Sequence, residues 1–206
     1  MLSKNFHIVY KVFFASLGLF AIAQETIVVI NRGTYNFVNF WSYFTNQSNL
    51  FAAIVLLVSA YALWRGYKWK HLDLFRGAST IYMVITGVVF AVLLSGGDIK
   101  TLTAVPIDNT ILHEIIPIAL VIDWLINPPA KRIAFVRSLL WLVYPVVYAA
   151  CALIRGALTN WYPYPFFNPE SGGYGPVAVT IVGISVFVIA LAWVLTRIPL
   201  TSKKKK

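Results

Sequence analysis

Six long apolar runs divide this chain, and they restrict its fold more than any other feature does. They cover residues 10–30, 44–64, 77–95, 108–126, 138–154 and 174–195. Roughly 18 or more mostly apolar residues can cross a hydrocarbon core about 30 Å thick as a helix, because each residue rises about 1.5 Å. Strands of a transmembrane barrel would instead alternate apolar and polar residues. The sequence therefore predicts an all-α, polytopic membrane protein, a bundle of six transmembrane helices.

The segments between the runs are too short to bury a core of their own, so we expect a single domain over residues 1–206. Hydrophobic residues make up 59% of the chain and charged residues only 12%, which excludes a water-soluble globular protein. The first run also resembles a secretory signal, with basic residues before it and AIA at 21–23. Apolar residues continue to position 30, which favours a retained span.

The basic residues are distributed unevenly, and this predicts the orientation of the helices. Of the 17 Lys and Arg residues, all except Arg32, Lys100 and Arg155 lie at one set of run ends, including the KKKK tail at 203–206. Short cytoplasmic segments retain Lys and Arg. We therefore expect both termini in the cytoplasm and the protein in the cell (cytoplasmic) membrane. The net charge of +10 then indicates contact with anionic membrane lipids and no nucleic-acid partner.

Ionisable residues inside the runs are candidates for a functional site, because a charge in a membrane is costly. They are Glu25, Asp108, His113, Glu114 and Asp123. In the predicted orientation, all of them except Asp123 belong to the outer half of the membrane. We expect Asp123 to form an ion pair with a Lys or Arg of the nearby basic loops. Glu25 has a similar structural interpretation, as an ion-pair partner of Arg32 or Arg155.

Helical spacing directs further polar side chains toward the same level of the bundle. Residues three or four positions apart share one face of a helix. The second run carries polar residues at i, i+3 and i+4, and the fourth run carries them at i and i+4. The fifth run has a stripe at i, i+4, i+7 and i+11. These groups are Thr45, Ser48 and Asn49; Asn109 and His113, followed by Pro117; and Tyr144, Tyr148, Cys151 and Arg155. Three helices are thus predicted to form one polar cluster.

Each of these residues also has a structural interpretation. Thr45 or Asn46 suits the cap of a helix that begins there. Ser48 and Asn49 suit hydrogen bonds between membrane helices. A lone histidine is usually a packed core residue, and Cys151 is expected to be a small packing residue without a disulfide.

The segment NWYPYPFFNPESGGYGP at 160–176 is rich in aromatic residues, Pro and Gly. Such a composition is not that of an ordinary solvated linker. We expect it to fold back over the outer end of the bundle as a lid that brings Tyr162 and Tyr164 toward the polar cluster. The alternative is an anchor at the membrane interface.

Three motifs, FTNQSNL at 44–50, LHEIIP at 112–117 with DW following, and WYPYPF at 161–166, resemble bacterial six-span proteins of the androgen-induced, FAR-17a-like family. The resemblance covers nearly the whole chain in span number and motif order. Animal members of that family, which include the androgen-dependent TFPI-regulating protein, hydrolyse fatty acid esters of hydroxy fatty acids with a Thr nucleophile and a His. The resemblance implies these roles for Thr45 and His113. The Asn-Gln-Ser-Asn continuation belongs to the bacterial branch, so the substrate transfers poorly.

The chemistry of these residues agrees with such an activity. A Thr hydroxyl becomes a nucleophile when a base removes its proton, and a neutral His suits that task near pH 7. Glu25 or Asp108 would orient the His113 ring, since Glu114 points about 100° away on a helix. Asn46 and Asn49, or free amides at the start of the second run, would stabilise an oxyanion. Substrate contacts are expected from a further set of residues: Ser48, Glu114, Tyr144, Tyr148, Arg155, Tyr162 and Tyr164.

The sequence thus predicts a membrane-embedded hydrolase of lipid or fatty esters with no cofactor. A zinc site is not expected, because His113 is the only histidine on that side. The alternative function is a non-enzymatic transporter or binding protein for a small amphiphile, in which the same cluster holds a ligand without reaction. A third interpretation is that the polar residues only hold the helices together.

Overall fold

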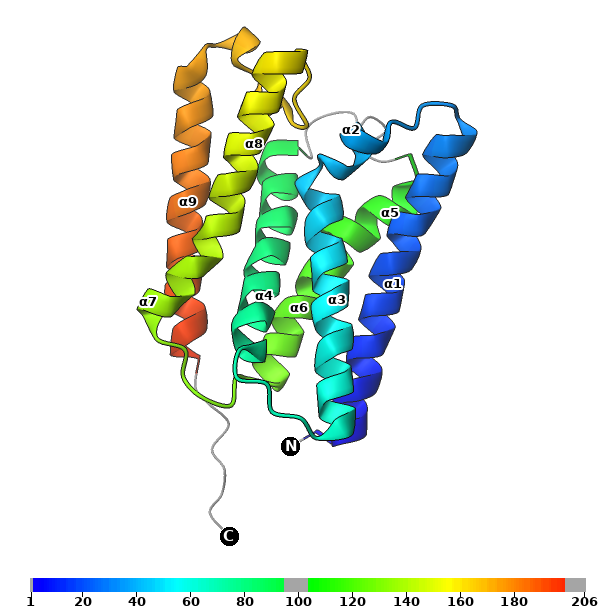
Figure 1. Ribbon diagram of the computed structural model, residues 1–206, viewed down its shortest axis with the longest axis vertical. Coiled ribbons are helices and arrows are strands. Elements are labelled where there is room, and N and C mark those ends of the chain that lie inside the picture. The colour runs from blue at the N-terminus through cyan, green and yellow to red at the C-terminus, as the bar shows by residue number, and fades with distance from the viewer. Residues whose placement is uncertain (1, 95–103, 199–206) are drawn as a thin grey trace.

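The protein is a bundle of helices that run roughly alongside one another, and the computed structural model describes residues 2–94 and 104–198 (Figure 1). Six helical segments are long and apolar enough to cross a membrane, and they match the six predicted runs. They are Lys4–Asn31, Phe44–Arg65, Leu72–Leu94, Pro106–Ile126, Phe135–Thr159 and Tyr174–Arg197. The fold is therefore all-α and that of a multi-pass membrane protein.

Three of the spans change their helix type along their length. The first, second and sixth spans are the uninterrupted helices α1 (Lys4–Asn31), α3 (Phe44–Arg65) and α9 (Tyr174–Arg197). The third is α4 (Leu72–Val89) with a π-helical turn, Phe90–Leu94; the fourth is α5 (Pro106–Thr110), a π-helical turn, Ile111–Ile115, and α6 (Ile116–Ile126); the fifth is α7 (Phe135–Ser138), a 3-10 turn, Leu139–Leu142, and α8 (Val143–Thr159).

One end of the bundle carries the short helix α2 (Phe37–Trp41) and two 3-10 turns, Pro165–Phe167 and Pro169–Ser171. We call it the α2 end. Helix α1 begins and α9 ends at the opposite end (Figure 1). The segments at the α2 end thus lie over the ends of α1, α4 and α8 and over the beginnings of α3, α5 and α9.

The fifth span is longer than the predicted 138–154. It begins at Phe135 and continues to Thr159, where Asn160 in the left-handed conformation (φ 52°) ends the helix. Its first part lies against α4: the Trp141 Nε1 donates to the Leu74 carbonyl at 2.8 Å. The Trp141 ring passes so close to α4 that a Cβ at Gly77 would lie 2.2 Å from it.

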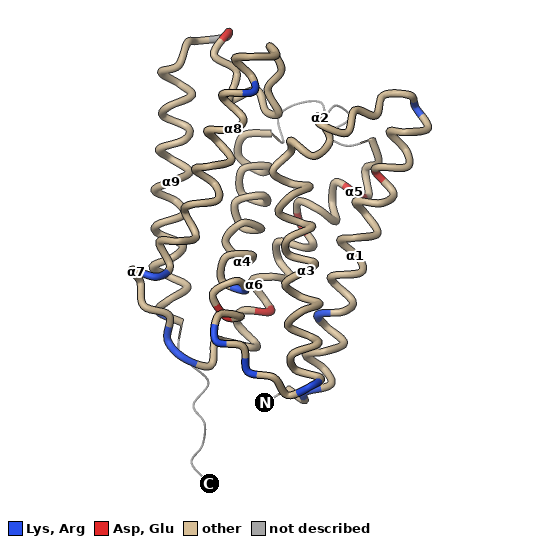
Figure 2. The backbone as a smooth tube through the Cα atoms, in the orientation of Figure 1, with Lys and Arg blue, Asp and Glu red and all other residues tan. Residues whose placement is uncertain are grey.

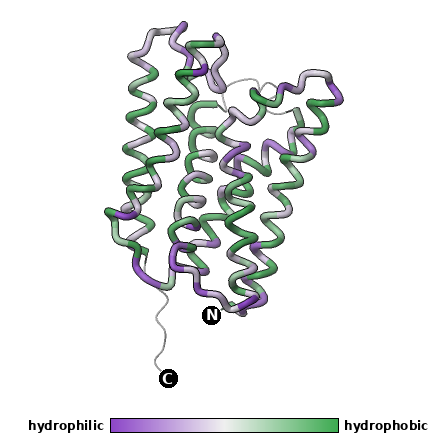
Figure 3. Tube along the Cα trace, in the orientation of Figure 1, coloured by the Kyte–Doolittle hydropathy of each residue, from purple (hydrophilic) through white to green (hydrophobic). Residues whose placement is uncertain are grey.

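The helices pack in two groups. Helix α1 lies along α3, α3 contacts α4, and α4 contacts α6, whereas α8 and α9 lie on the other side of α4 (Figure 1). Large apolar side chains on α8 and α9 remain exposed, among them Leu158 and Val179. Figure 3 shows hydrophobic residues along most of each helix. Such surfaces suit contact with lipid rather than water.

A buried ionic cluster joins α1, α4 and α6. The Asp123 carboxylate contacts the Lys11 ammonium and lies 3.0 Å from Arg76 Nη2, and Arg76 Nη1 lies 2.9 Å from Asp73. Lys11, Arg76 and Asp123 are all buried. The predicted ion pair of Asp123 is therefore confirmed, with partners that lie within helices. Two cations and two carboxylates balance, which offsets the cost of removing them from water.

Replacing Asp123 with Asn should destabilise the protein strongly, because Lys11 and Arg76 would stay buried without a balancing carboxylate. Breaking a buried ion pair costs about 3–5 kcal/mol. Unfolding of the Asp123→Asn variant in detergent measures the loss. Asp73→Asn is the matched control, with a smaller expected loss because that side chain is 29% exposed. Equal unfolding midpoints for wild type and Asp123→Asn would contradict the role of the cluster.

Candidate functional site

The start of α3 places Thr45 in the first helical turn, buried at the α2 end of the bundle. Tyr43 is the N-cap residue, and no side chain caps the helix. The capping interpretation of Thr45 and Asn46 is therefore wrong. The Asn46 Nδ2 instead donates to the Phe40 carbonyl at 2.8 Å, which holds α2 against α3.

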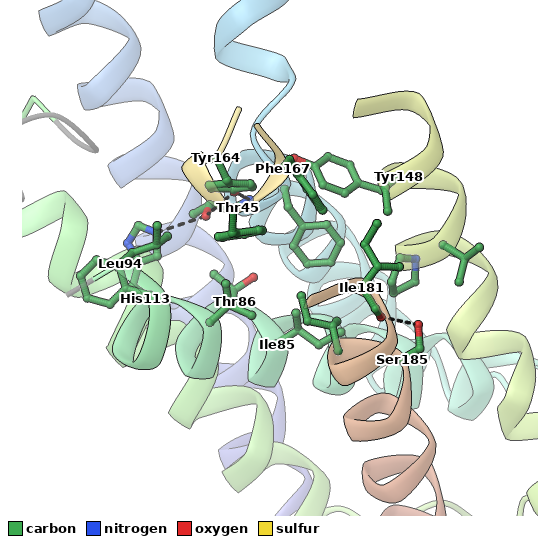
Figure 4. Close-up of a pocket in the computed structure, with 18 residues that line it drawn as sticks. Thr45, Ile85, Thr86, Leu94, His113, Tyr148, Tyr164, Phe167, Ile181 and Ser185 are labelled. Carbon is green, nitrogen blue, oxygen red and sulfur yellow. Dashed lines mark hydrogen bonds between the residues drawn. The ribbon is translucent and has the colours of Figure 1, made fainter. Parts of the chain in front are cut away.

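Thr45 and His113 form a hydrogen-bonded pair (Figure 4). The Thr45 Oγ1 lies 3.1 Å from the His113 Nε2, and the His113 Nδ1 lies 3.1 Å from the Asn109 carbonyl oxygen. A carbonyl oxygen only accepts hydrogen bonds, so the Nδ1 carries the proton and donates it. In the neutral ring the Nε2 then has a lone pair and accepts from the Thr45 hydroxyl. This is the arrangement of a nucleophile beside its base.

The backbone around His113 explains its position. Residues Ile111–Ile115 form a π-helical turn in which the Ile116 N–H donates to the Ile111 carbonyl. Pro117 follows, and because proline has no N–H, it cannot bond the His113 carbonyl as an α-helix requires. Gly87 of α4 makes room for the unbonded His113 carbonyl, because a Cβ at position 87 would crowd its oxygen at 3.0 Å. The Phe90 ring stacks on the imidazole, with centroids 4.3 Å apart.

Tyr164 brings a third polar group to Thr45. The Thr45 backbone N–H donates to the Tyr164 Oη at 3.3 Å, and the two hydroxyl oxygens lie 3.4 Å apart. Burial raises the pKa of Tyr164 above its ordinary value, because the phenolate would be poorly solvated. The phenol therefore stays protonated near neutral pH and retains a proton to donate.

The segment after α8 folds back over this end of the bundle, as predicted. Tyr164 and Phe167 are buried in it and pack on each other, with ring centroids 6.2 Å apart. Tyr162 does not reach Thr45. Its ring lies over Gly156 of α8, where an added Cβ would be only 2.0 Å from the Tyr162 Cε1.

Two pockets meet at the pair. One is mostly apolar and reaches from Thr45 toward Ile181 and Ser185 of α9 (Figure 4). Its cavity volume is about 50 Å³, measured as the space that the centre of a water molecule can occupy. The other pocket is polar, and its cavity volume by the same measure is about 310 Å³. Four residues line both pockets: Thr45, Leu94, His113 and Tyr164.

Ser48 and Asn49 hold neighbouring helices together. The Ser48 hydroxyl lies 2.9 Å from the Thr86 hydroxyl of α4. The Asn49 Nδ2 donates to the carbonyls of Thr45 at 2.9 Å and Leu112 at 3.2 Å. The bonds to Thr86 and Leu112 are the interhelical bonds of the structural interpretation, whereas the Asn49–Thr45 bond lies within α3. Both hydrogens of the Asn49 amide are engaged, so an oxyanion role for this residue does not fit.

The polar stripe of α8 faces the first turn of α3 and the segment that leads into it. Tyr144 donates to the Gln47 Oε1 at 2.7 Å, and Tyr148 donates to the Ser42 carbonyl at 2.8 Å. Arg155 donates to the Asn39 Oδ1 at 2.5 Å and lies over Trp161, 4.3 Å from its ring centre. Of these three α8 residues, only Tyr148 lines the apolar pocket. Cys151 is exposed, so its predicted packing role is wrong.

The acidic residues do not orient His113, contrary to the prediction. The Glu25 carboxylate accepts from the backbone N–H groups of Ala104 at 2.5 Å and Val105 at 3.2 Å rather than pairing with an arginine. Glu25 still lines the polar pocket. Asp108 is buried, and neither carboxylate oxygen has a hydrogen-bond partner in the described part of the chain. Glu114 is exposed and lies outside the site.

Sequence reasoning missed the contributions of Asn109, Phe90 and Leu94. Asn109 shares a helix face with His113, which was visible in the sequence, but its backbone carbonyl makes the contact. Phe90 and Leu94 look like ordinary apolar residues of a span. Within residues 2–94 and 104–198, no group of three or more His, Cys, Asp or Glu side chains is arranged to hold a metal ion.

Replacing Gly156 with Ala should loosen the segment over the site, because the new methyl would collide with Tyr162. Overpacking of this kind costs about 1–3 kcal/mol, although Ala favours helix. We expect faster cleavage of residues 160–173 by chymotrypsin and a lower unfolding midpoint in detergent. Gly175→Ala is the matched control, since nothing lies near a Cβ there. Equal cleavage rates for the two variants would refute the contact.

In comparisons with known proteins, no family model, no curated protein and no solved structure matches the chain. The resemblance of FTNQSNL, LHEIIP and WYPYPF to the FAR-17a-like family therefore rests on those motifs alone. The six candidate spans support the coarser description, a six-span helical membrane protein.

Proposed function

We propose that this protein is an integral-membrane hydrolase of lipid or fatty esters. The observation that carries the proposal is the pair of hydrogen bonds on His113: one to the Thr45 hydroxyl at 3.1 Å and one to the Asn109 carbonyl at 3.1 Å. Together they give the nucleophile a base and give the base its orientation. The motif resemblance supports the same two roles.

The reaction proceeds through an acyl-enzyme. The Thr45 oxygen attacks the ester carbonyl carbon while His113 takes the hydroxyl proton, and His113 then gives that proton to the departing alcohol oxygen. A water molecule attacks the acyl-Thr45 ester next. His113 accepts a proton from this water and returns it to Thr45 as the acid leaves.

Two kinds of donor are suited to the negative oxygen of the tetrahedral intermediate. The Tyr164 hydroxyl lies 3.4 Å from the nucleophile and stays protonated. The Thr45 N–H at the start of α3 is already bonded to the Tyr164 Oη, but the amides beside it have no carbonyl partner within their own helix, and the helix N-terminus carries a partial positive charge. Preformed donors in a site shielded from water are effective because they need no rearrangement during the reaction.

We also infer that both termini lie in the cytoplasm and that the site lies in the outer half of the cell membrane. Figure 2 shows most Lys and Arg near the end of the bundle where α1 begins. Arg32 directly follows α1 and Arg155 lies near the end of α8, so both belong to the α2 end. Short cytoplasmic segments retain basic residues. A lipid ester then reaches Thr45 from the outer leaflet, and water reaches it from the external side.

A fluorophosphonate probe should label the wild-type protein at Thr45. Thr45→Ala should abolish labelling, and Thr45→Ser should retain it because the hydroxyl remains. His113→Ala should slow labelling by about 10²–10⁴-fold, the usual contribution of a general base. Thr180→Ala is the control, because this half-buried residue of α9 lines neither pocket. Equal labelling of wild type and Thr45→Ala would exclude Thr45 as nucleophile, and lipid binding without labelling or hydrolysis would favour the amphiphile-binding alternative.

Cysteine labelling tests the orientation. In a Cys151→Ala background, Thr34→Cys should react with a membrane-impermeant maleimide in intact cells, because Thr34 is exposed at the α2 end. Lys68→Cys, exposed at the opposite end, should react only after the cells are permeabilised. The reverse pattern would show that the site faces the cytoplasm.

A further inference from the structure

Thr45, Leu94, His113 and Tyr164 stand between two pockets of opposite character, since each of the four lines both. A substrate whose reactive carbon lies at Thr45 must therefore extend one arm into each pocket. The lining of each pocket then indicates which arm it accepts.

The apolar pocket suits a hydrocarbon chain. None of the residues that line it carries a formal charge when His113 is neutral. Its other hydroxyls are already engaged: Thr86 donates to the Tyr82 carbonyl at 3.0 Å, Ser185 to Ile181 at 2.8 Å and Tyr148 to Ser42 at 2.8 Å. The surface left for a ligand is mainly carbon, which binds methylene groups by the hydrophobic effect.

The apolar pocket also reaches the outside of the bundle. Side chains of α4, α8 and α9 line it, and one of them, Val146 of α8, is 43% exposed. Apolar surfaces of the spans face lipid in a membrane. An acyl chain of a membrane lipid can thus pass between these helices toward Thr45 without crossing water.

The polar pocket suits a small neutral alcohol. Among the described residues that line it are one carboxylate, Glu25, and one guanidinium, Arg32, so their charges balance. Thr34, Asn36, Asn39 and Asn46 add hydroxyl and amide groups. The Asn36 and Asn39 Oδ1 atoms and the Asn46 Nδ2 are bonded within the protein, but the Asn36 and Asn39 Nδ2 donors and the Asn46 Oδ1 acceptor have no partner in the described part of the chain. These groups match the hydroxyls of a polyol, and the described lining carries no net charge that would attract an ion.

We infer that the substrate is an ester of one long acyl chain with a small, uncharged, polyhydroxylated alcohol, of the monoacylglycerol type. The acyl chain lies in the apolar pocket and the alcohol in the polar pocket. Hydrolysis then consumes one water molecule and yields a fatty acid toward the lipid and the alcohol toward the polar pocket. This inference rests on the proposed hydrolase function.

The test compares esters that differ in one arm at a time, with the full-length protein in detergent. Monopalmitoylglycerol and monobutyrylglycerol differ only in chain length. Ile181→Trp narrows the apolar pocket on its α9 side, far from Thr45 (Figure 4). Val182→Trp is the matched control, because Val182 is the next residue of α9 but its side chain is 61% exposed and lines neither pocket.

Ile181→Trp should lower kcat/KM for the palmitoyl ester by about tenfold or more, as expected when a chain loses its pocket, and leave the butyryl ester within about twofold. Val182→Trp should change neither. If Ile181→Trp loses activity on both esters, Ile184→Phe replaces it as the test, because it narrows the same pocket less. Its palmitoyl-to-butyryl ratio of kcat/KM should then fall below that of wild type. An unchanged palmitoyl-to-butyryl ratio in a variant that retains activity overturns the chain assignment.

The alcohol arm is tested with three palmitoyl esters, those of glycerol, choline and phosphoglycerol. Wild type should hydrolyse the uncharged glycerol ester fastest, and a higher kcat/KM for either charged ester overturns the alcohol assignment. Thr45→Ala distinguishes a failure of the proposed hydrolase function from a failure of the substrate assignment. Wild-type rates in Thr45→Ala, or no hydrolysis of any ester by wild type, refute the hydrolase itself, whereas Thr45-dependent hydrolysis with the wrong preferences refutes only this substrate.

Discussion

Lipid offers no hydrogen bonds, so the polar groups that this chain carries into the membrane are stabilised by partners within the protein, and most of those in the described part of the chain have one. That constraint organises both ends of the bundle. At one end, Lys11 reaches across to Asp123 of another span. At the other, the Asn49 amide donates to two carbonyls on different helices, and the Thr45 hydroxyl meets His113. The same requirement that holds the helices together thus assembles the candidate site.

Much of this arrangement could be predicted because its causes lie in simple patterns. Continuous apolar length predicts the six spans, and the position of Asp123 near basic residues predicts its ion pair. The proximity of Thr45 and His113 follows from two further patterns. Helical spacing puts them on polar faces, and the alternating direction of the spans puts those faces at one level.

The remaining details depend on backbone geometry that a residue pattern does not contain. No residue pattern marks the π-helical turn Ile111–Ile115, which contains both the buried His113 and the exposed Glu114. The group that orients the imidazole is the backbone carbonyl of Asn109, which every residue possesses and no motif marks. Glu25 bonds amides of a connecting segment instead of an arginine, and hydrogen bonds from backbone N–H groups to an ionised carboxylate are strong enough to hold it there.

The partition between the two pockets draws on segments that are far apart in the chain. Thr45 belongs to the second span, His113 to the fourth, and Tyr164 to the segment that connects the fifth and sixth spans. During synthesis, the proposed nucleophile therefore enters the membrane first, the histidine joins two spans later, and the phenol arrives only when the fifth span is complete. A partly made chain holds a threonine beside lipid but lacks the enclosure around it. The order of insertion thus delays assembly of the Thr45–His113–Tyr164 cluster until the last spans are made.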